Sequence, residues 1–387
     1  MNITGIITEY NIFHNGHKYQ IDEIKKHSDA VIAVMSGSFV QRGDVAITDK
    51  WSRAKTALSG GVDLVIELPV CYALNAAPNF ATGGINILNA LGVVNNICFG
   101  SESGSIDELM SAAELLENEN SEISEKIKKY VMSGMSYPNA LTKAYSALIP
   151  SDILSEPNNI LATEYIRALI RSDSKIKPMT VKRHKAGYHD RNLYQNIASA
   201  TKLREMNRNN ENINDFIPYK LEDINCDIPY NISNLDSAII SKLRLMSAEE
   251  LQNISEVTEG IENRILSSAN MSYSFETLVE NVKNKRYTTS KIRRMIISAL
   301  IGFTKDIYSP MPQYIRILGM NKVGMTILKQ AKDICKVPII TKTADFKEQS
   351  PQFNLDVCAT NIAMLCNPIP THRIGNADLK KSPIIMK

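Results

Sequence analysis

The sequence predicts an α/β protein with a Rossmann-like parallel sheet, followed by an all-helical C-terminal domain. Up to about residue 210, short apolar runs alternate with stretches of helical character, the pattern of parallel βαβ units with helices on both faces of a sheet. From about residue 230 this alternation stops, and one helix-like segment follows another. We therefore predict two domains, at residues 1–215 and 216–387.

The N-terminal domain is expected to contain five strands and the helices between them. The strands are predicted at Ile3–Thr8, Ala30–Ser36, Asp63–Leu68, Asn96–Gly100 and Lys175–Lys182. Helices are predicted from about Asn15, at Lys50–Ser59 and Asn79–Leu91, and across 105–172 with breaks near Gly134 and Pro150–Pro157. Ligands of open parallel sheets bind at the carboxyl ends of strands, where the strand order switches. The four loops after these strand ends are thus expected to converge on one crevice: 14–17, 36–42, 100–102 and the segment after Lys182.

The second half contains a succession of predicted helices. They are expected at Leu235–Met246, Glu249–Asn253, Glu256–Ala269, Ser274–Asn281, Ser290–Ile301 and Asn321–Ala331. Residues 205–235 are rich in Asn and Asp, which is typical of a connection between domains.

Composition narrows the class of protein. The chain has 387 residues, of which 44% are hydrophobic, and none of its apolar runs approaches the ~20 residues that a membrane span needs. The N-terminus enters a strand directly, and the six cysteines include no CxxC pair, so we expect a cytoplasmic protein with reduced cysteines and no structural zinc. Because the net charge is only +3, any RNA binding has to come from a local basic patch.

The most informative motif is His-Asn-Gly-His at residues 14–17, directly after the first predicted strand. Gly16 lets the backbone approach phosphate oxygens, and the helix that begins near Asn15 directs free N–H groups and its positive dipole end at an anion. His14 and His17 are then placed to donate hydrogen bonds to oxygens whose charge rises in the transition state. The alternative is a pair of ordinary histidines in a surface turn. The position of the motif in a βα unit favours phosphate chemistry, with His14 and His17 as catalytic residues.

Three later segments supply further candidates at the same edge of the sheet. Asn158 and Asn159 precede a helix, where one is an N-cap or reaches a nucleotide. Arg183, followed by His184, ends the last strand and is either a surface residue or a contact for pyrophosphate. The segment 199–204, SATKLR, is a second phosphate cradle through Ser199 and Thr201, or else a capped helix with solvated charges.

A basic segment in the second half suggests contact with RNA. Residues 283–295, KNKRYTTSKIRRM, place six Lys or Arg residues around one tyrosine. One interpretation is a solvated helix start with a Thr-Ser cap. The other is a patch for the RNA backbone with a tyrosine available for stacking. The candidate RNA-binding residues are Lys285, Arg286, Tyr287, Arg293 and Arg294.

Together these segments resemble the bacterial tRNA(Met) cytidine acetate ligase family of the HxGH nucleotidyltransferase superfamily. The resemblance covers essentially the whole chain, in order, through ITEYNIFHNGHKYQ (7–20), VMSGSFVQRGD (34–44), DLVIELP (63–69), FGSES (99–103), PNNILATEYIRAL (157–169), VKRHKAGYHD (181–190), SATKLR (199–204) and KRYTTSKIRRMIISALIG (285–302). The sequence departs from the family pattern at three places. Ile12 stands where proline is expected, Ser38 where asparagine is usual, and Ala162-Thr163 where Gly-Ile is usual. None of these changes removes a side chain expected to touch phosphate.

The resemblance implies a two-step reaction. Acetate attacks the α-phosphate of ATP to give acetyl-adenylate and pyrophosphate, and the acetyl group then passes to N4 of the wobble cytidine of elongator tRNA(Met). Magnesium is expected with ATP, and no metal ligands from the protein are predicted. The nucleotide contacts that the resemblance implies are combined here with the candidates above. The resulting set is Ile7, Thr8, Glu9, Tyr10, Asn11, His14, Asn15, Gly16, His17, Gln20, Gly100, Asn159, Arg183, Ser199 and Thr201. The alternatives are a nucleotidyltransferase for a small cofactor precursor and a non-catalytic RNA-binding protein.

Overall fold

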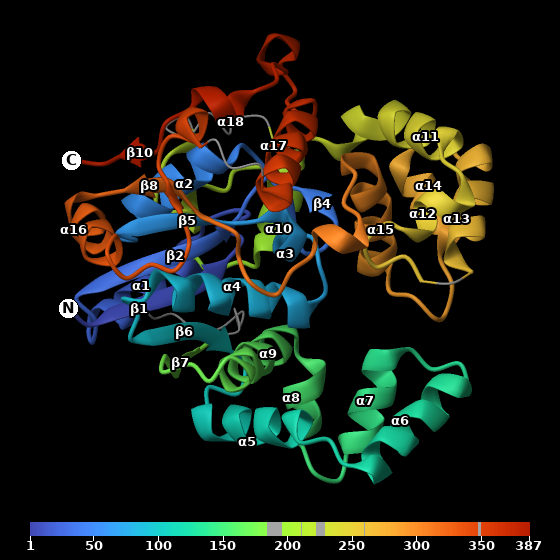
Figure 1. Ribbon diagram of the computed structural model, residues 1–387, viewed down its shortest axis with the longest axis horizontal. Coiled ribbons are helices and arrows are strands. Elements are labelled where there is room, and N and C mark those ends of the chain that lie inside the picture. The colour runs from blue at the N-terminus through green and yellow to red at the C-terminus, as the bar shows by residue number, and fades with distance from the viewer. Residues whose placement is uncertain (184–195, 210, 222–228, 259, 347–349) are drawn as a thin grey trace.

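The computed structural model describes the chain except for residues 184–195, 210, 222–228, 259 and 347–349. Its centre is a sheet with the strand order β10-β8-β5-β2-β1-β6-β7, and β9 pairs with β8 (Figure 1). The described strands are β1 (Ile3–Thr8), β2 (Ala30–Ser36), β3 (Phe39–Val40), β4 (Asp44–Val45), β5 (Leu64–Leu68), β6 (Asn96–Ser101), β7 (Lys177–Lys182), β8 (Ile315–Met320), β9 (Ile339–Ile340) and β10 (Ile384–Ile385). All pairs in the sheet are parallel except β5 with β8. The predicted parallel α/β fold is therefore confirmed.

Helices surround this sheet and form two further groups beside it. The described α-helices are α1 (Asn15–Lys25), α2 (Lys50–Ser59), α3 (Val70–Ala73), α4 (Ala77–Leu91), α5 (Ile106–Glu117), α6 (Ser121–Met132), α7 (Tyr137–Tyr145), α8 (Ser151–Ser155), α9 (Pro157–Arg171), α10 (Ala200–Arg208), α11 (Asp236–Leu245), α12 (Ala248–Gln252), α13 (Ile261–Met271), α14 (Phe275–Val282), α15 (Thr289–Ile301), α16 (Lys322–Ala331), α17 (Pro351–Met364) and α18 (Ala377–Lys380). Among the described residues, no helix is long and apolar enough to cross a membrane.

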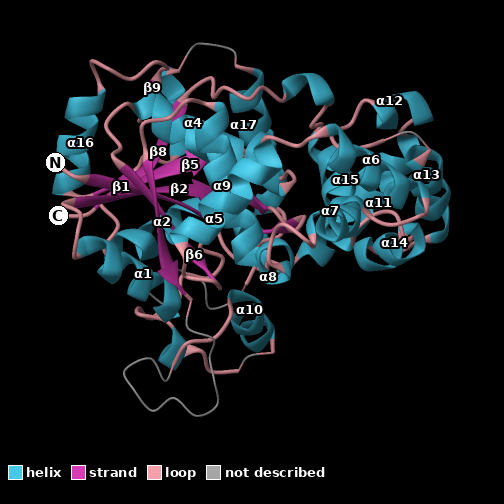
Figure 2. Cartoon of the chain, turned by 90° about the horizontal axis from the view of Figure 1, so that it is seen from below, coloured by secondary structure: helices cyan, strands magenta, loops and turns pink. Residues whose placement is uncertain are grey.

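The sheet has a core on each face because its central strands are apolar on both sides. In β2, Ile32 and Val34 face the core that contains α4, whereas Val31 and Ala33 belong to the second core with α1 and α2. All seven residues of β2 are buried, as expected for a central parallel strand. Figure 2 shows the strands enclosed between helices. The rigid two-faced sheet fixes the positions of the loops at its edge.

The order of the strands places the switch point at β1. From β1 the chain moves outward through β2 and β5, and it then returns to add β6 and β7 on the other side of β1. A crevice therefore opens outside the carboxyl ends of β1 and β6. The HNGH turn follows β1, and Gly100 lies in β6 itself. The sheet thus brings two predicted site segments to one place.

The helical region differs in extent from the prediction. Helices α11–α15 pack on one another beside the sheet (Figure 1, yellow to orange). The chain then re-enters the sheet, because β8 pairs with β5 and β10 pairs with β8. Residues 315–385 therefore do not continue the predicted all-helical domain of 216–387. The proposed boundary near 215 is not tested by this topology, and the predicted connection at 205–235 is only partly described, since 210 and 222–228 lie outside the described residues.

A buried group of four charges explains why the C-terminal segment belongs to the sheet. Arg316 of β8 lies between Glu67 of β5 and Asp378 of α18, with N–O distances of 3.2 and 2.5 Å. Lys50 of α2 contacts the same two carboxylates at 2.5 and 2.8 Å. All four side chains are almost completely inaccessible, so each charge requires the others. Arg316 is the one charged residue of IRILGM, where it weakens the apolar pattern of a strand, and its charge is paired with carboxylates in this group.

Candidate nucleotide-binding site

The HNGH turn forms a reciprocal hydrogen-bonded cap at the start of α1. His14 is the N-cap residue, and its Nδ1 accepts from the N–H of Gly16 at 3.1 Å. The Nδ1 of His17 accepts from the N–H of His14 at 3.2 Å. The two imidazole rings are stacked, with centroids 3.8 Å apart and planes 20° apart. The motif therefore fixes both rings against the helix N-terminus.

These hydrogen bonds set the protonation of both histidines. Because each Nδ1 is an acceptor, the proton of the neutral ring is assigned to Nε2. Burial, with the positive charges of Arg183 and Arg204, lowers the pKa of His14 to about 4. Burial also lowers the pKa of His17 well below its ordinary value, with the neighbouring His14 and Arg183 acting in the same direction. Both residues are thus neutral Nε2–H donors at neutral pH.

Gly16 is required by the close approach of His14. A Cβ at this position would lie 2.9 Å from Cε1 and 3.0 Å from Nδ1 of the His14 ring. Any side chain here would displace the imidazole that caps the helix. The glycine of the motif therefore preserves the ring geometry as well as access to the backbone.

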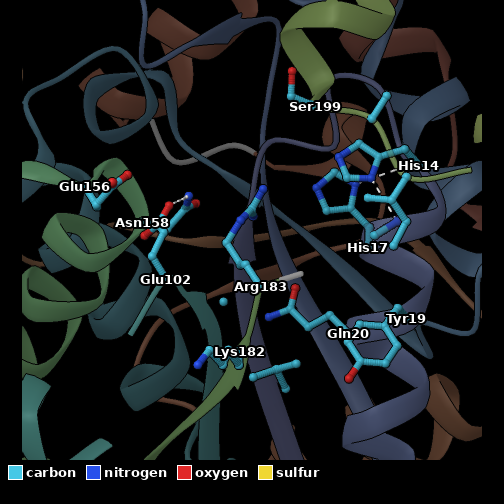
Figure 3. A pocket seen from close by; sticks show the side chains of 15 residues that line it. His14, His17, Tyr19, Gln20, Glu102, Glu156, Asn158, Lys182, Arg183 and Ser199 are labelled. Atoms are coloured by element: carbon cyan, nitrogen blue, oxygen red, sulfur yellow. Dashed lines mark hydrogen bonds between the residues drawn. The ribbon is translucent and has the colours of Figure 1, made fainter. Parts of the chain in front are cut away.

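A pocket of about 320 Å³ opens beside the two histidines. Its walls come from the start of α1, the end of β6, the start of α9, the end of β7 and the residues before α10 (Figure 3). The lining residues are His14, Gly16, His17, Tyr19, Gln20, Gly100, Glu102, Glu156, Asn158, Val181, Lys182, Arg183, Ile197, Ala198 and Ser199. In Figure 3, Arg183 lies between the histidines and the group formed by Glu102, Asn158 and Glu156.

About half of the predicted nucleotide contacts line this pocket. They are His14, Gly16, His17, Gln20, Gly100, Arg183 and Ser199. His184 and the rest of the 184–190 part of the VKRHKAGYHD motif lie outside the described residues. Of the four predicted loops, 36–42 does not line the pocket, although Arg42 in it lies 3.5 Å from the hydroxyl of Thr201. The loops 14–17 and 100–102 converge on the pocket, and Arg183, the one described residue at the start of the segment after Lys182, lines it too.

The remaining predicted contacts are not among the residues that line the pocket. Ile7 and Tyr10 are buried in the two cores, and the hydroxyl of Thr8 accepts from the N–H of Tyr10 at 3.3 Å. The side chain of Asn11 accepts from the N–H of Ile47 at 2.7 Å, and that of Asn15 donates to the carbonyl oxygens of residues 196 and 215. Glu9 accepts from the N–H of Gln41 at 2.7 Å. Their direct contact with a nucleotide stays a prediction.

The two asparagines at the start of α9 have separate positions. Asn159 is completely buried, and its Oδ1 accepts from the N–H groups of Glu102 and Ser103 at 2.9 and 3.1 Å. Asn158 lines the pocket instead, and its Nδ2 donates to Glu102 Oε1 at 2.5 Å. Asn159 therefore shapes the turn after β6, whereas the side chain that lines the pocket belongs to the half-buried Asn158. An asparagine pair in sequence does not reveal which member faces the ligand.

The segment 199–204 begins α10 as the pattern predicts. Ser199 is the N-cap, and its hydroxyl accepts from the N–H of Lys202 at 3.2 Å. Thr201 lies in the first turn of α10, where its hydroxyl accepts from a guanidinium nitrogen of Arg204 at 3.1 Å. Arg204 also donates to the carbonyl oxygen of Asn11. Helix α10 is thereby tied to the residues that precede the HNGH turn.

Several pocket residues were not named individually among the predicted nucleotide contacts. Tyr19, Glu102, Glu156, Val181, Lys182, Ile197 and Ala198 complete the lining. Some of them had a usable signal, because Glu102 belongs to the predicted loop 100–102 and Lys182 adjoins the predicted Arg183. Tyr19 lies three residues after Gly16, about one turn along α1. Glu156 and the residues before Ser199 become neighbours only through the fold.

The predicted RNA-binding residues divide into two groups. Lys285 and Arg286 are exposed, and Tyr287 is half-buried with its hydroxyl 2.8 Å from that of Thr258. Arg294 is buried, and all its guanidinium nitrogens are engaged, two by Glu256 and one by the carbonyl oxygen of Gln41. This arrangement favours a structural role for Arg294 over contact with RNA.

Arg293, like Arg294, lies between α15 and the β3–β4 hairpin. Its Nε donates to the carbonyl oxygen of Gly43 at 3.0 Å, and Glu276 receives two bonds of 2.7 Å. Gly43 has a φ of +72°, and a Cβ there would lie 2.6 Å from Cβ of Arg293. The hairpin and α15 are therefore in direct contact, with the two arginines between them.

Comparisons with known proteins agree with this geometry over the full chain. The model of the HIGH Nucleotidyl Transferase family matches residues 1–378. Proteins called tRNA(Met) cytidine acetate ligase from Clostridium novyi and Acetivibrio thermocellus are 40% and 38% identical, with 100% of each chain covered. Thermotoga maritima TmcAL, solved with bound alpha-thio ATP, has a TM-score of 0.90 at 32% identity, again with 100% of both chains covered. This chain therefore belongs to the HIGH nucleotidyl transferase family and groups with its tRNA(Met) cytidine acetate ligases.

Proposed function

We propose that this protein activates acetate with ATP as acetyl-adenylate and transfers the acetyl group to N4 of the wobble cytidine of elongator tRNA(Met). The observation that carries the proposal is the pair of stacked, neutral histidines that begin α1 beside the pocket. Two Nε2–H donors and a helix N-terminus together suit a phosphate whose oxygens gain charge during the reaction. The full-length similarity to ligases of that name supports the choice of acetate and tRNA.

In the first step, the carboxylate oxygen of acetate forms a bond to the α-phosphorus of ATP. The bond to the β-phosphate breaks, and pyrophosphate leaves with the electron pair. Acetate is already ionised at pH 7, so this step needs no general base. His14 and His17 hold the α-phosphate oxygens, and Arg183 neutralises the departing pyrophosphate by charge-assisted hydrogen bonds.

Magnesium is proposed to enter with the triphosphate. Among the described residues, no group of three or more His, Cys, Asp or Glu is placed to hold a metal ion. Mg²⁺ commonly keeps several waters and binds substrate phosphates with few protein ligands, so this donor set is compatible with the ion. When bound, it would supply charge neutralisation at the phosphate oxygens.

The helical region is proposed to bind tRNA. Lys285 and Arg286 are exposed just before α15, and the charges of Arg286 and Lys291 lie 5.6 and 5.1 Å from the centre of the Tyr287 ring. Exposed cations beside an aromatic ring suit an RNA backbone. Since the proposed substrate is a tRNA, we place the enzyme in the cytoplasm.

A labelled-acetate assay tests the proposal. The protein is incubated with ATP, Mg²⁺ and labelled acetate, with and without an unmodified elongator tRNA(Met) transcript. We expect acetate-dependent ATP–pyrophosphate exchange without RNA, and label in N4-acetylcytidine with RNA. Exchange without any labelled RNA would favour a nucleotidyltransferase for a small molecule. Absence of both would favour an RNA-binding protein without this activity.

A further inference from the structure

The acidic side chains of the pocket lie at the end away from the two histidines. Glu102 and Glu156 both line the pocket, and Figure 3 places them, with Asn158, on the far side of Arg183 from the histidines. The phosphates of a nucleotide are attracted to the histidine end, where α1 begins, and are repelled by carboxylates. The acidic end of the pocket is therefore left for the nucleoside.

The part of the pocket between these two ends is formed by the last residues of β6 and β7. Gly100 pairs with Val181, and both line the pocket. A Cβ at Gly100 would lie 3.2 Å from Cγ of Arg183, so the glycine lets the arginine lie close to β6. Lys182, whose side chain is exposed, lies apart from Glu102 in Figure 3. A strand edge with a glycine and one aliphatic side chain suits the uncharged faces of a ribose and a base.

Glu102 sets the orientation of the Asn158 amide. The Nδ2 of Asn158 donates to Glu102 Oε1 at 2.5 Å. A carboxylate has only acceptor oxygens, so Asn158 cannot turn its own oxygen toward Glu102. Among the described residues, no hydrogen bond is donated to Asn158 Oδ1. Because Asn158 lines the pocket, Oδ1 offers the pocket a hydrogen-bond acceptor.

The Glu102 carboxylate is itself held in place by the start of α9. Its Oε2 accepts from the N–H of Asn159 at 2.9 Å. The side chain of the buried Asn159 in turn accepts from the N–H of Glu102, also at 2.9 Å. Both oxygens of Glu102 are thus engaged by α9, and the carboxylate acts on a ligand only through Asn158.

Resting on the proposed function, we propose that Glu102 is a positioning residue through which the pocket selects adenine. It holds Asn158 so that Oδ1 accepts a hydrogen bond from the exocyclic N6 amine of ATP. Guanine and hypoxanthine carry a carbonyl oxygen at that position of the ring, which would bring two acceptors together. A site built to accept from an N–H group disfavours an analogue that lacks it, because the acceptor is left unpaired.

The test is the variant Glu102→Gln, assayed with ATP and with ITP, whose base is hypoxanthine. The N–H of Asn159 still needs an acceptor, so the new amide keeps its oxygen there and turns its NH2 group to Asn158. Asn158 then rotates its oxygen to that group and offers Nδ2 to the pocket, which suits the carbonyl oxygen of hypoxanthine. The single substitution should therefore reverse the hydrogen-bonding character of the pocket wall.

The readout is kcat/KM for each nucleotide in acetate-dependent exchange with pyrophosphate. We expect the parent to prefer ATP over ITP by about 10-fold or more, and Glu102→Gln to lose this preference, using ITP about 3–10-fold better than the parent does. Damage to the fold would not improve the use of ITP. Asn158→Ala, which removes the acceptor, should use ATP no better than purine riboside triphosphate, which lacks the amine.

The matched control is Glu108→Gln, which changes an exposed carboxylate in the first turn of α5 and should keep the parental preference. An ATP preference that Glu102→Gln leaves unchanged overturns the inference, and so do a parent that uses both nucleotides equally and an equal loss of both in the variant. A changed preference between ATP and 2′-deoxy-ATP, with that over ITP unchanged, would assign Asn158 to the ribose and likewise overturn it.

Calorimetry of ATP and ITP binding without acetate separates this inference from the proposed function. If the parent shows no acetate-dependent exchange, the proposed function fails. The binding preferences of the parent, Glu102→Gln and Glu108→Gln then decide whether Glu102 selects the base. If exchange is present and those preferences do not differ among the three proteins, the inference fails alone.

Discussion

The pocket at the end of β1 and the basic segment at 283–294 illustrate two different relations between sequence and function. In the pocket, short motifs far apart in the chain meet, because the segments that end β1, β6 and β7 lie at one edge of the same sheet. In the basic segment, adjacent cations separate, because Lys285 and Arg286 precede α15 whereas Arg293 and Arg294 lie within it and face the β3–β4 hairpin. Topology gathers the first set, and position before or within α15 divides the second.

The comparison shows that position relative to a strand end predicts more than local density of charge. The carboxyl ends of parallel strands all lie at the same edge of the sheet. Once a strand is recognised in the sequence, the location of the residues that follow it is therefore known. A run of cations gives no such direction: Lys285 and Arg286 precede α15 and are exposed, whereas Arg293 and Arg294 lie in α15 and both donate to the hairpin. The charges at 283–294 therefore serve two purposes in one short run of sequence.

The largest expected effect is a loss of folding stability when the contact between α15 and the β3–β4 hairpin is removed. Arg294→Ala leaves Glu256 without its bidentate partner in a mostly buried position, at original distances of 2.5 and 2.8 Å. Removing one member of a buried ion pair costs about 3–5 kcal/mol. Urea unfolding of the variant should show a loss of this size. Arg286→Ala, an exposed change in the same segment, should stay within about 0.5 kcal/mol. Equal stability of both variants would mean that Arg294, like Arg286, faces solvent and does not stabilise the fold.

The next effect concerns the pocket alone. His17→Ala removes a neutral Nε2–H donor, and we expect acetyl-adenylate formation to fall ~10²–10³-fold, as for loss of a preorganised donor to a developing anion. Acetate-dependent ATP–pyrophosphate exchange measures it. His27→Ala changes an exposed histidine just after α1 and should leave the rate unchanged. A His17→Ala rate within threefold of the parent contradicts the role.

A smaller loss is expected at the end of β7. Arg183 is exposed beside Gly100, so its side chain contributes little to the core. Arg183→Ala should lower kcat/KM for ATP by about 10–100-fold, equivalent to a charged hydrogen bond of about 1.5–3 kcal/mol. The melting temperature should be unchanged, and Lys177→Ala at the exposed start of the same strand is the control. A lowered melting temperature with normal kinetics would show that Arg183 is structural.

The sequence was most informative where local pattern and position agree. Strands β1, β2, β5, β6 and β7 lie within one or two residues of their predicted bounds, because apolar runs bounded by turn residues have few alternatives. Strand β8 was missed because Arg316 interrupts an apolar run, and its ion-pair partners Glu67 and Asp378 are distant in sequence. No pattern local to residues 315–320 contains those partners.

The site divides in the same way. His14, Gly16 and His17 were predictable because the chemistry of their spacing is local. The exchange of roles between Asn158 and Asn159 was not, because it depends on which face of α9 meets the turn after β6. Likewise, the burial of Arg294 depends on a hairpin about 250 residues earlier in the chain. Contacts of this kind require the folded structure.

The smallest expected effect isolates the exposed part of the basic segment. Lys285 and Arg286 are both exposed before α15, so Lys285→Ala with Arg286→Ala should leave stability and ATP–pyrophosphate exchange unchanged. If each contacts an RNA phosphate, the plot of log affinity for tRNA against log salt concentration should flatten by roughly one unit per residue. Lys322→Ala with Lys329→Ala removes the same charge from exposed positions of α16, on the opposite side of the molecule (Figure 1), and should leave the slope as it is. An equal slope for both pairs would mean that tRNA docks away from residues 285–286. A flatter slope only for the Lys285 and Arg286 variant would show that these two cations face RNA. Arg293 and Arg294, which hold the hairpin, are unchanged in both variants and so cannot account for the difference.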